Sequence, residues 1–196
     1  MTQTAQQVLD TVGYSGFVRA LYNRTGDLSK DFTHAVLGLV TESHEYLNAT
    51  DRVNAVEEVG DLTFYREALE QVLNDLSPID YAEADKAYGE IMDGLSKQTS
   101  TVNLTEMHTE WLDLAKRWVG YGKAPTMPTS LLIAEATAML TVTIPVGLLE
   151  DEDTGKVIIT NVEKLLKRYN GMQFDSDRAV NRDTPAERKV LEASVG

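Results

Sequence analysis

The chain contains no cysteine, so disulfide bonds and thiolate metal sites are excluded. Basic residues are also scarce: 18 Lys and Arg stand against 31 Asp and Glu, a formal net charge of −13. Because binding to a nucleic-acid backbone depends on Lys and Arg neutralising phosphates, we expect no nucleic-acid partner. The acidic balance favours cation binding instead, and oxygen ligands without thiolates favour Mg²⁺, with Mn²⁺ as a second choice.

The sequence also lacks a basic, apolar leader. Residues 1–7 carry neither a positive flank nor an apolar run, so we expect no signal peptide and a cytoplasmic location in a bacterial or phage-infected cell. The stretch 130–149 approaches the length that a bilayer requires, but Glu135 and Pro145 argue against membrane spanning. We expect a buried helix there, ending near Pro145, and no membrane partner.

Apolar residues recur at helical spacing along most of the chain. The pattern predicts an all-α fold, an antiparallel four-helix-bundle core with additional N- and C-terminal helices, forming one domain over residues 1–196. Residues 97–101 are the best linker candidate, joining two halves of this domain. The expected helices cover 4–24 with an interruption at Gly13 or Gly16, a segment capped by Ser29 or Asp31 and closed at 48–51, then 52–74, 78–95, 105–119 and 130–145, a segment around Lys164, and a last helix beginning at Thr184.

Two pairs of acidic residues stand out at i, i+3 spacing: Glu42 with Glu45, and Glu58 with Asp61. On a helix each pair projects from one face, so two neighbouring antiparallel helices can offer four carboxylates to one cation cluster. Glu58 shares its helix face with apolar residues one and two turns later, which predicts that it points inward, whereas Glu57 points to the more polar side. A carboxylate facing apolar packing without a partner costs several kcal/mol, and a bound cation removes that penalty. The alternative is that all these acids are solvated helix surface.

The acidic string resembles the motif of the MazG-like, all-α nucleoside triphosphate pyrophosphatases. That motif is a Gly-Leu-led Glu-x-x-Glu, a spacer, and Glu-x-x-Asp on the next helix, and here it begins at Gly38 and ends at Asp61. A second match is the run from Lys164 to Tyr169, followed by Phe174, Asn181 to Asp183, and Glu187. The resemblance implies an Mg²⁺-dependent enzyme that cleaves a nucleoside triphosphate between the α and β phosphates, giving a nucleoside monophosphate and pyrophosphate.

Within this hypothesis the metal ligands are Glu42, Glu45, Glu58 and Asp61, and Glu45, or failing that Glu42, deprotonates the attacking water. The C-terminal segment 160–196 is basic, and its Lys164, Arg168 and Arg182 suit the outer phosphates. The open alternative for Lys164 and Arg168 is ion pairing with the acidic helices. Residues 105–140 faintly repeat 38–65 and carry Lys116 and Lys123, which are second choices for phosphate binding.

Base selection needs aromatic and amide side chains, for which the candidates are Tyr14, Phe17, Asn23 and His44. We expect a deoxynucleoside triphosphate substrate, with a purine such as dGTP slightly ahead of a pyrimidine. A homodimer or higher homo-oligomer is expected, since family members build the pocket with help from a neighbouring subunit. The competing hypothesis is a helical bundle that binds a metal, a nucleotide or a partner protein without turnover.

Overall fold

The computed structural model describes residues 4–97, 104–144 and 154–195. These residues form nine helices and no strand, which confirms the predicted all-α class. The helices are α1 (Ala5–Leu21), α2 (Leu28–Leu47), α3 (Arg52–Leu76), α4 (Tyr81–Ser96), α5 (Leu104–Tyr121), α6 (Thr129–Thr143), α7 (Thr154–Tyr169), α8 (Ser176–Val180) and α9 (Thr184–Val195).

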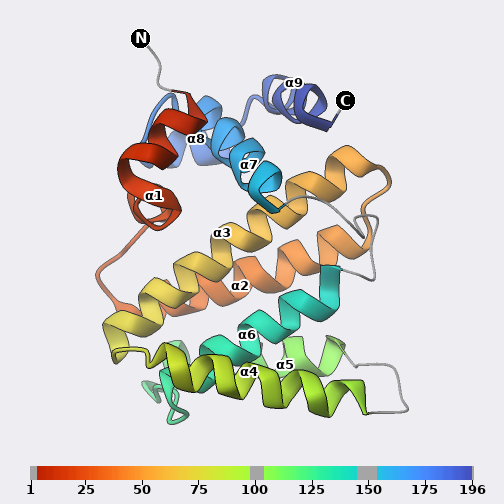
Figure 1. The fold of residues 1–196 in the computed structure, drawn as a ribbon. Helices are drawn as coiled ribbons and strands as arrows, with labels where there is room; N and C mark the ends of the chain where they lie inside the picture. The colour runs from red at the N-terminus through yellow and green to blue at the C-terminus, as the bar shows by residue number, and fades with distance from the viewer. Residues whose placement is uncertain (1–3, 98–103, 145–153, 196) are drawn as a thin grey trace.

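The long helices α2 and α3 form an antiparallel pair at the centre of the molecule (Figure 1). Helices α1, α7, α8 and α9 gather on one side of this pair, and α4, α5 and α6 gather on the other. Most buried apolar side chains join one continuous core through α2 and α3, the arrangement expected when a central pair is covered on both sides. The expected four-helix-bundle core stays a prediction, because the contacts define a central pair with a group of helices on each side.

Polar side chains cap the helices at positions that differ in part from those predicted. Asp27, rather than Ser29 or Asp31, caps α2 by accepting hydrogen bonds from the backbone N–H groups of Ser29 and Lys30. Asp31 is instead fully buried and holds the preceding loop, accepting from Arg24 and from the backbone and hydroxyl of Thr25. The helix therefore begins earlier than predicted, because Asp27 takes the cap and leaves Asp31 free to tie down the loop.

The connection between α2 and α3 is short, as expected, with Asn48 ending α2 and Asp51 capping α3. The α1 helix is kinked at Gly13, whose φ of 67° is readily adopted only by a residue without a side chain. Asp183, rather than Thr184, caps α9 through the backbone N–H of Ala186. The predicted linker at 97–101 lies outside the described residues except for Lys97.

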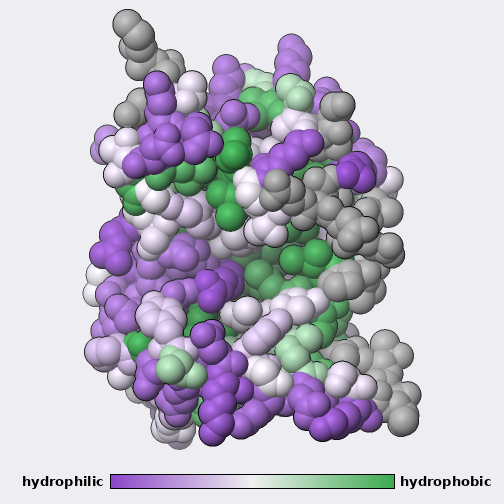
Figure 2. All heavy atoms as spheres, viewed as in Figure 1, coloured by the Kyte–Doolittle hydropathy of each residue, from purple (hydrophilic) through white to green (hydrophobic). Residues whose placement is uncertain are grey.

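The helices of the suggested second repeat do not pack as α2 and α3 do. Helix α5 lies mainly against α2, and α6 lies mainly against α4 and α3, so α5 and α6 do not form an intimate pair of their own. The repeat stays a hypothesis, and this packing argues against it. Hydrophilic side chains cover the lower edge of the molecule over α4 (Figure 2). Within the described segments, no helix combines the length and apolarity that crossing a membrane requires.

Candidate functional site

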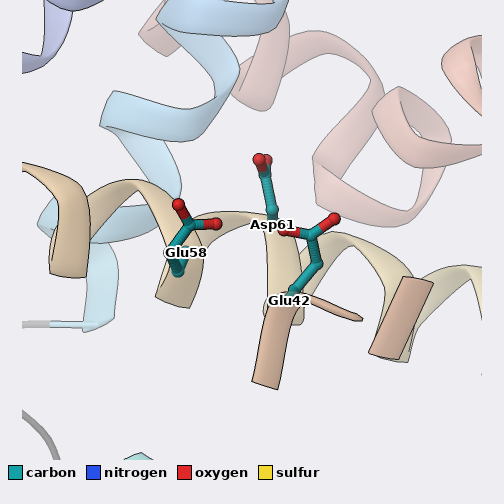
Figure 3. Close-up of side chains that lie close together, drawn as sticks. All are labelled: Glu42, Glu58 and Asp61. Carbon is teal, nitrogen blue, oxygen red and sulfur yellow. The ribbon is translucent and has the colours of Figure 1, made fainter. Parts of the chain in front are cut away.

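Three of the four predicted metal ligands come together between α2 and α3. Glu42 on α2 and Glu58 and Asp61 on α3 each offer one carboxylate oxygen, and these oxygens lie within 4.8 Å of one another. Figure 3 shows Glu42 and Glu58 turned towards each other from the two helices. Glu58 is only 8% exposed, which confirms that it points inward. The antiparallel pairing of two helices, each with acids one turn apart, is what places these groups together.

Burial makes this cluster unfavourable while it is fully ionised. Removal from water, then the charge of Asp61, raises the pKa of Glu42 to about 9. Removal from water also raises the pKa of Glu58 to about 7, and a hydrogen bond joins the two carboxyl groups. Burial and the neighbouring acids thus favour the protonated form in this pair over two full charges.

As pH rises, the stability of the metal-free protein should consequently fall and the stabilisation caused by Mg²⁺ should grow. Both pKa values lie above the ordinary value of 4.5, so from there to about pH 9 the folded protein holds protons that the unfolded chain has lost. The free energy of unfolding of the metal-free protein must fall as pH rises through this window. Mg²⁺ binds the ionised carboxylates, so the increase in melting temperature caused by Mg²⁺ should be small at pH 5.5 and large at pH 8.5. Melting curves in EDTA and in Mg²⁺ measure this, and an increase that does not change with pH would contradict it.

Asp61 is held in place by two residues of α7. The Lys164 ammonium lies 2.6 Å from one Asp61 oxygen, and the Asn161 amide donates to the other at 2.7 Å. Lys164 is fully buried and also lies 3.4 Å from Glu57. Lys164 is therefore not placed to bind outer phosphates as predicted. Its charge is paired with acids of α3, which was the alternative left open for it. Helix α7 can approach this closely because Gly60 has no side chain, since a Cβ there would lie 2.8 Å from the Asn161 Cβ.

Arg168 and Arg182 are brought together by one carboxylate of α9. Glu187 is 2% exposed and accepts two hydrogen bonds from each guanidinium group, through Nε and one Nη in both cases. Arg182 also lies 3.3 Å from Glu57. Glu187 accepts from Nε and Nη2 of each arginine. The second terminal nitrogen, Nη1, of each arginine makes no hydrogen bond or ion pair with another residue in the described part of the chain. Two fixed, partly free guanidinium groups are well suited to phosphate oxygens.

The acids and the arginines line one cavity of about 530 Å³. Glu45 and Asn23, both predicted site residues, line it too, although Glu45 lies outside the close group formed by the other three acids. The volume is within the range of small-molecule sites. Most of the lining side chains are acidic, basic or aromatic, and a few are aliphatic or amide: Leu21, Tyr22, Asn23, His34, Glu42, Glu45, Glu57, Glu58, Asp61, Phe64, Tyr65, Leu165, Arg168, Tyr169, Phe174, Ala179 and Arg182.

Several predicted residues lie elsewhere. Lys116 pairs with Asp113 on the exposed face of α5, and Lys123 is exposed beyond the end of that helix. Neither lines the cavity, because α5 packs on α2 whereas the cavity is closed by α7 and its neighbours. Tyr14 and Phe17 stack on each other within the core, 6.4 Å apart, and His44 is exposed outside the cavity. The predicted phosphate contacts of Lys116 and Lys123 and the predicted base contacts of Tyr14, Phe17 and His44 are therefore not supported by this cavity.

Sequence reasoning missed His34, Glu57, Tyr65 and the clamping role of Glu187. Glu57 was assigned to the polar side of α3, yet it lines the cavity and contacts Lys164 and Arg182, because α7 and α9 cover that side. His34 precedes Glu42 by eight residues, close to two helical turns, and this spacing was a readable signal that both lie on one face.

The MazG-like resemblance rests on the acidic motif and on the C-terminal run from Lys164. The structure brings residues of both segments to one cavity. No protein-family model matches the chain, and no curated protein and no solved structure matches it.

Proposed function

We propose that this protein is an Mg²⁺-dependent nucleoside triphosphate pyrophosphohydrolase of the MazG-like kind. The observation that supports this most is the opposition of charges in one cavity. Glu42, Glu58 and Asp61 converge from α2 and α3, and Arg168 and Arg182 face the same space from the α7 to α9 region. A metal with a polyphosphate needs carboxylates on one side and guanidinium groups on the other.

The acidic residues fit a divalent cation. All three offer oxygen ligands, which Mg²⁺ and Mn²⁺ prefer, at mutual distances that one ion can bridge. Lys164 pairs with Asp61, whereas the raised pKa values of Glu42 and Glu58 are those of two buried carboxyl groups close to other acids. A divalent cation bound here supplies positive charge, neutralises polyphosphate and lowers the pKa of water.

The protein residues divide the remaining tasks among them. Lys164 and Asn161 fix the Asp61 carboxylate in position within reach of the other two acids. Arg168 and Arg182 bind outer phosphate oxygens through the Nη groups that Glu187 leaves free. Glu45 lines the cavity but is exposed and outside the close group, so it is available to orient the attacking water and accept its proton.

Three further proposals accompany this function. Nucleoside triphosphates are cytoplasmic metabolites, and we place the protein in the cytoplasm. We retain the homodimer, or a higher oligomer, and the preference for a purine deoxynucleotide as proposals. Mass measurement in solution and a substrate panel test them separately from the chemistry.

The activity is tested by incubating the protein with Mg²⁺ and a panel of ribo- and deoxynucleoside triphosphates. Phosphorus NMR should show a nucleoside monophosphate and pyrophosphate in equal amounts, and EDTA should stop the reaction. Release of inorganic phosphate with a nucleoside diphosphate would instead show cleavage between the β and γ phosphates, which contradicts the proposed reaction. Binding of nucleotides without any product would favour the alternative of a non-catalytic binding bundle.

A further inference from the structure

The cavity has an aromatic end that the metal and phosphate chemistry does not use, and an inference about it rests on the proposed function. Tyr22 and His34 stack with their ring centroids 4.9 Å apart and their planes 15° from parallel. His34 also meets the edge of Tyr65 at 5.7 Å, and Phe64 lies 5.6 Å from Tyr65. All four rings line the same cavity as the acids.

The order of residues along the two helices gives the cavity a direction. On α2 the lining residues run from Glu45 through Glu42 to His34. On the antiparallel α3 they run from Glu57 through Asp61 to Phe64. Glu42 and His34 are eight residues apart on α2, which corresponds to about 12 Å along the helix axis. The Glu42 carboxylate and the His34 ring therefore lie at separate places in the cavity. Arg182 marks the far end, because it contacts Glu57.

The floor between the two ends is made by Tyr65. Its ring fills the space left by Gly38, where a Cβ would lie 2.3 Å from the ring. The missing side chain of Gly38 thus makes room for Tyr65 rather than for a ligand. Because Gly38 lies midway between His34 and Glu42 on α2, the Tyr65 ring lines the cavity at a level between the aromatic end and the acidic cluster.

Hydrogen-bonding groups at the aromatic end are few. The Tyr22 hydroxyl is already used, since it donates to the backbone carbonyl of Asp31. The ring nitrogens of exposed His34 make no hydrogen bond with any other residue in the described parts of the chain, and Asn23 adds an exposed amide to the cavity lining. A flat ligand resting here would thus meet aromatic surface together with one imidazole and one amide.

We propose that Tyr22, Asn23, His34 and Phe64 form a nucleobase subsite, which orients a nucleotide with its base at this end and its terminal phosphates towards Arg182. His34 and Phe64 provide surface for stacking, which every base can use, and buried Tyr22 packs against the His34 ring and supports it. His34 and Asn23 provide the hydrogen bonds that distinguish one base edge from another. The substrate is accordingly a nucleotide rather than a base-free polyphosphate.

The test measures binding rather than turnover, so it is independent of whether the protein hydrolyses its ligand. Calorimetry in Mg²⁺ would give Kd values for the α,β-imido analogues of four deoxynucleoside triphosphates and for inorganic tripolyphosphate. The wild type should bind at least one nucleotide analogue about tenfold to a hundredfold more tightly than tripolyphosphate, the range expected for loss of base stacking. His34→Ala should lower this ratio about tenfold and leave the Kd of tripolyphosphate unchanged. His44→Ala, a histidine of the same helix outside the cavity, should change neither value.

Four results would overturn the assignment. Tripolyphosphate could bind the wild type as tightly as every nucleotide analogue, or no analogue could bind at all. His34→Ala could weaken nucleotide and tripolyphosphate equally. Finally, Phe174→Leu, at the Tyr169 side of the cavity, could remove the preference for a nucleotide while His34→Ala leaves it intact, which would place the base at that side.

Discussion

Glu58→Gln is expected to reduce Mg²⁺-dependent hydrolysis more than about a hundredfold while making the metal-free protein more stable. Loss of an outer-shell partner of a metal ligand already costs 10- to 100-fold, and this change removes a charge from the ligand group itself. Glu58 is 8% exposed and its pKa is raised to about 7, so its ionised form is unfavourable in the fold. A neutral amide of the same shape should increase the free energy of unfolding by about 1–2 kcal/mol at pH 8.

Turnover with a saturating triphosphate and melting temperatures in EDTA and in Mg²⁺ measure both effects. Glu67→Gln is the matched control, because Glu67 lies on the same helix outside the cavity and its bond from Gln71 can be kept by an amide oxygen. The control should behave as wild type in all three measurements. If Glu58→Gln retains near-wild-type turnover, the assignment of the metal site is wrong.

Lys164→Met should have the largest effect on stability. It removes a fully buried ammonium group, so that Asp61, which is 17% exposed, loses its cation and Glu57, which is 19% exposed, keeps only Arg182. Breaking a buried ion pair by removing one partner costs about 3–5 kcal/mol, and the partial exposure of the two carboxylates places this case at about 3 kcal/mol. For a chain of this length the melting temperature should fall by about 6–12 °C. Mg²⁺ should recover more stability in this variant than in the wild type, because Asp61 has then lost the ammonium group that offsets its charge.

The exposed Lys167 on the same helix provides the control, and Lys167→Met should leave the melting temperature nearly unchanged. Adding Asp61→Asn to Lys164→Met should restore part of the lost stability, since it removes the charge that is left without its cation. A double-mutant cycle over these two positions measures their coupling directly. Additive effects would show that the 2.6 Å contact contributes nothing to folding.

The acidic half of the site was predictable because its geometry is local. Glu42, Glu58 and Asp61 lie on two consecutive helices joined by a short connection, so helical periodicity and antiparallel pairing suffice to bring them together. The inward direction of Glu58 followed from its apolar neighbours one and two turns along the same helix. No contact with a distant part of the chain was needed for either conclusion.

The basic half was less predictable because it depends on how α7 and α9 pack. Arg168 and Arg182, which were predicted to bind phosphates, do line the cavity. Helical periodicity, however, cannot show whether Lys164 faces a ligand or an acid of α3. The same packing explains the error over Glu57, since α3 is covered on several faces and its polar side is not a solvent side. His44 was named as a candidate base contact and His34 was not considered, yet His34 lines the cavity and His44 does not.

The pairing of Asp61 with Lys164 joins residues 103 positions apart in the chain. Helices α2 and α3 leave the ribosome long before α7, so a growing chain can close the acidic hairpin before the lysine that neutralises it has been synthesised. Contacts of such long separation also form late in refolding, because the intervening chain must first be ordered. Until then protons or dissolved cations can offset the repulsion within the hairpin, and a divalent cation held by Glu42, Glu58 and Asp61 would act as a temporary substitute for Lys164 during folding.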